Sequence, residues 1–125
     1  MRSENITENH FTIGNQERIK ILKAEQMLRT YAHQKFPGIT AIAREVGLSE
    51  TKLKECYKAV YHVTVFQYFQ NLQMYMARQL ILETDMPVHQ IALKFCYEHA
   101  GKFAAAFKAC HGVLPSDIKR VAAYR

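Results

Sequence analysis

IAREVGL at residues 42–48 and IALKFCY at residues 91–97 are two copies of one pattern. Each copy predicts a short helix that ends in a tight turn. Apolar or aromatic residues four apart follow both copies: Leu53, Tyr57 and Tyr61 after the first, and Phe103, Phe107 and His111 after the second. That spacing places them on one face of a further helix. Two helix-turn-helix units are therefore predicted, one in each half of the chain.

The amino-acid composition of the whole chain favours an all-α fold. The chain has 125 residues, enough for one domain, and 49% of them are hydrophobic, as in a folded protein. Only three prolines and five glycines interrupt it, and apolar residues do not alternate with polar ones as they do in strands. We therefore expect about seven helices and no sheet.

The segments on either side of the two copies complete the predicted organisation of the chain. Residues 1–15 are polar and are predicted to be a flexible tail or the remnant of a linker. A helix over about 16–32 comes next, with Ile21, Ala24, Leu28 and Tyr31 on its buried side. The other predicted elements are a helix-turn-helix at about 40–61 with Thr40 as N-cap, a central linker helix at about 65–83, a second helix-turn-helix at about 88–110, and a last short helix beginning near Pro115. Phe66, Phe69, Met76, Ala77 and Leu80 are expected to form the inward side of the central helix.

Charge and hydropathy restrict the possible partners. The formal net charge is +6 and the isoelectric point is about 9.3, a balance that is common in nucleic-acid-binding domains without being specific to them. No stretch approaches the roughly 20 apolar residues of a membrane span, and no signal peptide follows Met1. A cytoplasmic protein without a membrane partner is expected.

Taken together, these residues resemble the DNA-binding domain of the AraC/XylS family of bacterial transcription regulators. The resemblance covers about residues 16–120. In the second half it rests on the Ile91-Ala92 pair, on Phe103 and Phe107, and on GVLPS at residues 112–116. In the first half it rests on Ala43, Gly47-Leu48-Ser49, Leu53, Tyr57 and Phe66-Gln67-Tyr68.

The chain departs from the family pattern at five positions. His62 and Cys96 stand where glycine is usual, so both are expected to adopt positive φ at some cost. Leu114 replaces a threonine, and Gln73 and Lys119 stand where arginine is common.

The resemblance implies sequence-specific binding of double-stranded DNA in a homeodomain-like fold. Each helix-turn-helix would place its second helix in a major groove. The 19-residue central helix would be a rod of about 28 Å, close to the roughly 34 Å between successive major grooves on one face of DNA. The first unit is expected to carry most of the sequence discrimination.

The helical wheel then selects the side chains that would contact DNA. Residues expected to contact bases are Thr51, Lys54 and Glu55 in the first unit, and His99, Gly101, Ala104 and Ala105 in the second. Residues expected to contact phosphates are Ser49, Lys52, Lys58, Lys102, Lys108 and Ser116. Ser49 and Ser116 could equally serve only as caps of their own helices.

Three alternatives to DNA binding have different degrees of support in the sequence. Cys96 and His99, with Cys110-His111 downstream, have a spacing that could hold zinc, but Cys110 lies on the inward stripe of its helix. The three cysteines are expected to be reduced and buried, and neither a metal nor a cofactor is predicted. No arrangement of nucleophile and base suggests an enzyme. A helical protein-interaction module without DNA contacts remains the alternative function.

Family resemblance adds further partners. It implies contact with RNA polymerase, and a separate effector or dimerisation domain in the full-length protein. No effector pocket is expected within the DNA-binding module itself.

Overall fold

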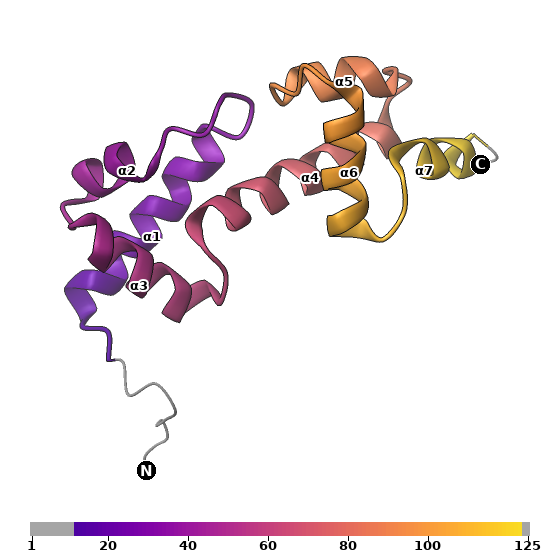
Figure 1. Ribbon diagram of the computed structural model, residues 1–125. Coiled ribbons are helices and arrows are strands. Elements are labelled where there is room, and N and C mark those ends of the chain that lie inside the picture. The colour runs from indigo at the N-terminus through magenta and orange to yellow at the C-terminus, as the bar shows by residue number, and fades with distance from the viewer. Residues whose placement is uncertain (1–11, 124–125) are drawn as a thin grey trace, which may run out of the picture. The chain divides into compact units, whose positions relative to one another are not determined.

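The computed structural model describes residues 12–123, which contain seven helices and no strand (Figure 1). The all-α prediction is confirmed for this part of the chain. The helices are α1 (Asn15–Thr30), α2 (Ile39–Val46), α3 (Glu50–Tyr61), α4 (Val65–Glu83), α5 (Val88–Lys94), α6 (Ala100–His111) and α7 (Pro115–Ala122). None of these helices is both long enough and apolar enough to cross a membrane.

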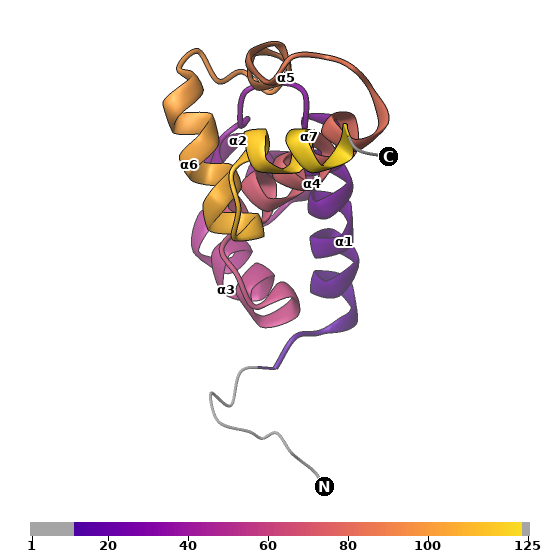
Figure 2. The same cartoon turned by 90° about the vertical axis from the view of Figure 1, so that its right-hand side faces the viewer.

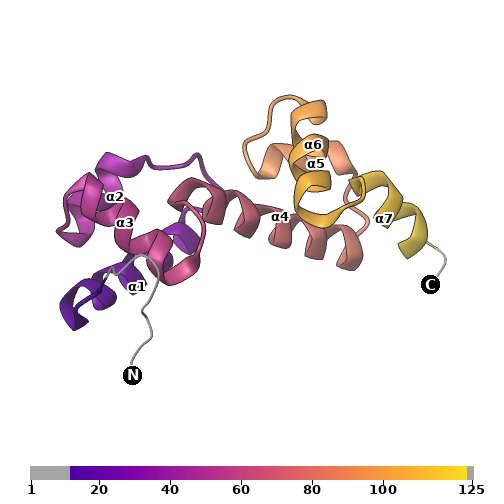
Figure 3. The same ribbon diagram turned by 60° about the horizontal axis from the view of Figure 1, so that its bottom comes forward.

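The first of two compact units contains α2, α3 and most of α1, within residues 12–27 and 38–65 (Figure 3). Apolar residues recur at three- and four-residue intervals on each helix, so each contributes one stripe to a shared core. Fully buried members are Ile21 and Ala24 of α1, Ile42 of α2, and Leu53, Cys56 and Tyr57 of α3. This core fixes which face of α3 remains in solvent.

Local backbone chemistry sets the ends of α3. Gly47 adopts a left-handed conformation (φ 80°) after α2, where glycine has no Cβ to clash. The Ser49 side chain then accepts a hydrogen bond from the Lys52 backbone N–H at 3.1 Å, as an N-cap does. At the other end His62 takes φ 68°, so the expected positive φ at this position is confirmed.

Two side chains of α1 join that helix to the first helix-turn-helix. The Lys20 ammonium donates to the Gly47 carbonyl at 3.2 Å, in the turn between α2 and α3. The Glu17 carboxylate lies 3.2 Å from the Lys52 ammonium in the first turn of α3. Both contacts brace the start of α3 against α1.

The second unit contains α5, α6, α7 and nearly all of α4, and it also includes residues 28–37 (Figure 2). Figure 3 shows α7 near the C-terminal end of α4. The core of this unit is centred on three aromatic residues, each of which is at most 1% exposed to solvent: Phe95, Phe103 and Phe107. Met74, Ala77 and Ile81 of α4 and Ile91 and Ala92 of α5 complete the cluster.

Residues 28–37 belong to the second unit because their contacts lie there. The His33 ring stacks on Phe95 with centroids 4.8 Å apart. Gln73, which is buried, donates from Nε2 to the Ala32 carbonyl at 3.0 Å and to the Phe95 carbonyl at 3.3 Å. One amide group therefore binds the segment after α1 and the end of α5 to α4.

Three details predicted from the sequence are wrong. Thr40 is not an N-cap: it lies in the first turn of α2, and its hydroxyl donates to Glu50 at 2.6 Å, while Gly38 occupies the cap position. Phe66 is not inward, since half of it is exposed. Of the three cysteines only Cys56 is buried; Cys110 is half-buried, and Cys96 is exposed because it occupies the turn after α5 with φ 67°.

The two cysteine thiols that are buried or half-buried have low reactivity. Burial raises the pKa of both Cys56 and Cys110, because an apolar environment disfavours the thiolate. Within residues 12–123, no group of three or more His, Cys, Asp or Glu side chains could hold a metal ion.

Candidate nucleic-acid interface

The solvent side of α3 carries the polar residues that the sequence assigned to the first recognition helix. Leu53, Cys56 and Tyr57 fill the opposite side completely. The exposed residues recur at three- and four-residue spacing and so share one face. They are Thr51, Lys54, Glu55 and Lys58. This face offers hydroxyl, ammonium and carboxylate groups, which between them can donate to guanine and accept from cytosine.

Lys52 has a different environment from the other lysines of α3. Its ammonium is paired with Glu17 across the unit, and that contact raises the pKa of Lys52. The Glu17 carboxylate also accepts from the Gly14 backbone N–H at 3.1 Å; this bond and the Lys52 ammonium lower the pKa of Glu17. Both groups therefore stay charged at neutral pH, and Lys52 is held toward α1.

The outer side of α6 has a different character. Phe103 and Phe107 are fully buried, while Gly101, Lys102, Ala105 and Lys108 are exposed and Ala104 is half-buried. A Cβ added at Gly101 would meet no atom within 4 Å, so the helix surface there is open. His99 is the N-cap residue, is exposed, and makes no side-chain capping bond. The face is nearly flat, with lysines as its only long side chains.

Ser49 and Ser116 differ in their role at the start of their helices. Ser49 uses its oxygen lone pair for the cap, which leaves its hydroxyl proton free to donate outward. Ser116 lies inside α7 and is not a cap. The Asp117 carboxylate instead accepts from the Leu114 N–H at 3.2 Å and pairs with Arg120 at 2.6 Å, and these contacts lower its pKa. Asp117 therefore takes the capping role at this helix start, and the phosphate contact of Ser116 stays a prediction.

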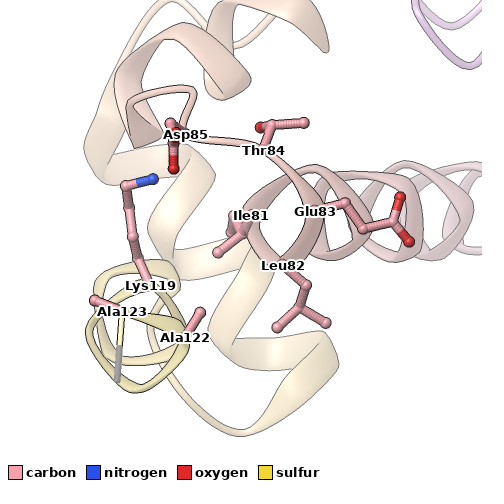
Figure 4. Close-up of a pocket in the computed structure, with 8 residues that line it drawn as sticks. All are labelled: Ile81, Leu82, Glu83, Thr84, Asp85, Lys119, Ala122 and Ala123. Atoms are coloured by element: carbon pink, nitrogen blue, oxygen red, sulfur yellow. The ribbon is translucent and has the colours of Figure 1, made fainter. Parts of the chain in front are cut away.

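A hollow of about 450 Å³ lies at the end of α4, beside α7 (Figure 4). Eight residues line it: Ile81, Leu82, Glu83, Thr84, Asp85, Lys119, Ala122 and Ala123. Lys119 reaches from α7 and donates to the Met86 carbonyl at 3.1 Å. This bond ties α7 to the segment after α4, and no residue predicted to contact DNA lines the hollow.

The sequence analysis did not identify Glu17 or Lys20 and gave no structural role to Gln73, although each fixes part of a helix-turn-helix unit: the start of α3, the turn before α3 and the end of α5. Their partners lie between 22 and 41 residues away along the chain. No local pattern could have indicated them. For Gln73, the signal available was a polar residue on a predominantly apolar stretch of α4.

Known proteins share the helix-turn-helix pattern of this chain. A family profile described as "Helix-turn-helix domain" matches residues 42–120, which include both recognition helices. A probable thc operon regulatory protein of Rhodococcus erythropolis is 30% identical over 98 residues, covering 75% of this chain and 30% of that protein. The chain spans 10 to 38% of the length of the curated relatives it matches.

Solved structures show the same fold. An AraC-type transcriptional regulator from Chromobacterium violaceum superposes with a TM-score of 0.78 at 20% identity, over 88% of this chain and 97% of that one. The DNA-binding domain of AdpA, solved with a target DNA, gives a TM-score of 0.74 at 16% identity, over 85% and 93% of the two chains. The chain therefore belongs to the AraC/XylS family, the helix-turn-helix DNA-binding domains of transcription regulators.

Proposed function

We propose that this domain recognises a bipartite site on double-stranded DNA through the exposed faces of α3 and α6. The observation that carries the proposal is the presence of two units, each with a helix packed on one side by aromatic and aliphatic residues and exposed on the other. Family membership supports DNA as the partner. The net charge of +6 also favours a polyanion as the binding partner.

The two faces are proposed to have different roles. Thr51, Lys54 and Glu55 of α3 contact base edges, while Lys58, with Ser49 at the helix start, contacts the backbone. On α6, Gly101, Ala104 and Ala105 allow close approach and contact with thymine methyl groups, and His99 contacts a base at the helix start. Lys102 and Lys108 contact phosphates.

Two further partners follow from family membership. We propose that the domain acts within a longer regulator that carries an effector or dimerisation domain, because the matching relatives are much longer than this chain. We propose contact with RNA polymerase on the same ground. Neither partner has a location on the described surface.

The experiment that tests the proposal is selection from a randomised duplex pool, followed by fluorescence anisotropy on the enriched sites over a range of salt concentrations. A site with two half-motifs about one helical turn apart, and an affinity that falls steeply with salt, is expected. Absence of duplex binding at low salt would contradict it. That result would favour a helical protein-interaction module instead.

Lys54→Ala is expected to relax specificity at one base step by about 1–3 kcal/mol, because an ammonium on the exposed face of α3 is lost. Lys102→Ala is expected to weaken all sequences about equally and to reduce the salt slope by about one. Anisotropy on the selected site and on single-base variants separates the two results. A larger loss of specificity from Lys102→Ala would contradict the proposed division between the helices.

Glu17→Gln is expected to raise affinity for DNA a few-fold and to steepen its salt dependence. The reason is that a neutral amide at position 17 offsets less of the positive charge of Lys52 than the Glu17 carboxylate does, so that charge attracts a phosphate more strongly. Glu45→Gln, an exposed residue of α2, changes the net charge equally and serves as the control. Equal effects from the two variants would mean that charge alone is responsible; in Lys52→Gln protein, the Glu17→Gln effect is expected to disappear.

A further inference from the structure

A second hollow, of about 320 Å³, lies wholly within the second unit. Its walls come from the segment after α1, the first turns of α4, and the turn between α5 and α6. The volume is at the lower end of the range for small-molecule sites. None of the residues proposed to contact DNA lines it.

Aromatic rings form much of the wall. The Phe36 ring centroid lies 5.2 Å from those of both Phe66 and Phe69. Phe66 is half exposed, so part of its phenyl ring remains in contact with water. A flat ring placed against it would remove that apolar surface from water.

Gln73, which lines the hollow, offers one hydrogen-bond acceptor of fixed orientation. Gln73 is only 4% exposed, and its Nε2 donates to two carbonyls, those of Ala32 and Phe95. Because both acceptors face the amide nitrogen, the amide cannot flip, and Oε1 is left to accept. Among residues 12–123 no donor is paired with that oxygen. A molecule in the hollow with an N–H or O–H group would satisfy it.

Two further polar groups line the hollow. The Tyr97 hydroxyl accepts from Gln70 Nε2 at 3.3 Å, so its own proton is available to donate. The Lys35 side chain is exposed, and within the described residues no carboxylate is paired with its ammonium. An anionic group near the opening would therefore find a cation.

We propose that this hollow binds a small planar aromatic anion that carries an N–H or O–H donor. The ring stacks among the phenyl groups, the donor bonds to Gln73 Oε1, and the acid group pairs with Lys35. This departs from the expectation that the module has no effector pocket. The hollow at the end of α4 is a weaker candidate, because its cation, Lys119, is already bonded to the Met86 carbonyl.

Nuclear magnetic resonance titration of the free protein with indole-3-acetate tests the proposal without DNA, so the result is independent of the proposed function. Saturable shifts of the amide signals of Phe36, Phe66 and Tyr97 are expected. 1-Methylindole-3-acetate, which lacks the N–H, and indole-3-acetamide, which lacks the charge, are each expected to bind several-fold more weakly. The comparison with 1-methylindole-3-acetate tests the hydrogen bond to Gln73 without a mutation of this buried residue.

Two variants examine the protein side. Phe66→Ala is expected to weaken indole-3-acetate several-fold while leaving the fold intact, since the ring is half exposed. Lys35→Met should abolish the preference for the acid over the amide, whereas Lys94→Met, an exposed lysine outside the hollow, should not. Equal binding of the three probes, shifts confined to other residues, or no saturable shift at millimolar concentration would each overturn the proposal.

Discussion

Phe103→Ala is expected to lower the free energy of unfolding of the second unit by about 3–5 kcal/mol, the usual cost of removing a buried phenyl ring. Phe103 is completely buried, and its ring lies 5.6 Å from that of Tyr97 and 5.9 Å from that of Phe107. The cavity would open beneath α6. Urea denaturation followed by circular dichroism measures the effect.

Val121→Ala is the matched control for this prediction. Val121 is an apolar residue of α7 that is 67% exposed, so its truncation should change stability by less than about 0.5 kcal/mol. A loss below about 1 kcal/mol for Phe103→Ala would mean that the second unit does not depend on this aromatic cluster, since such cavities normally cost more.

Ala105→Glu is expected to reduce DNA affinity about 100-fold or more without loss of fold, because like charges held together at an interface cost several kcal/mol. Ala105 is exposed in the middle of α6, and Gly101, one turn before it, has open space around it. A carboxylate there would face phosphates and also keep the helix away from the groove. Anisotropy with the selected duplex measures the loss.

Gln79→Glu makes the same change in charge on an exposed position of α4 and should alter affinity only a few-fold. Ala105→Ser provides a second comparison, since it adds one small polar atom and no charge. If Ala105→Glu and Gln79→Glu gave equal losses, the outer face of α6 would not be the contact surface. The circular dichroism spectrum of each variant confirms that the helices remain.

Helix positions were largely predictable because they depend on local chemistry. The C-terminal end of α3 and both ends of α4 were predicted close to the residues where the structure has them, from apolar spacing. The inward faces of α3 and α6 follow from the same periodicity, and with them the exposed sides of Thr51, Lys54 and Ala105. Sequence alone could therefore select the faces of α3 and α6 that remain exposed in the fold.

What could not be predicted depends on contacts between distant parts of the chain. Thr40 has the chemistry of a cap, but a hydrogen bond to Glu50 was available within the fold and Gly38 ended the helix instead. The phenyl ring of Phe66 fits an apolar stripe, yet it lies where the first turn of α4 leaves the core. Lys52 was expected to be available to DNA, and only the fold brings Glu17 to it.

The interleaving of the two units bears on how such a domain can change through evolution. The sequence repeat suggests duplication of a helix-turn-helix, but the second unit also includes residues 28–37, which precede the first copy. Recombination that exchanged residues 66–123 alone would separate Gln73 from the Ala32 carbonyl and Phe95 from the His33 ring. Exchange between relatives should therefore succeed for whole domains, while half-domain chimaeras should need compensating changes in the segment after α1.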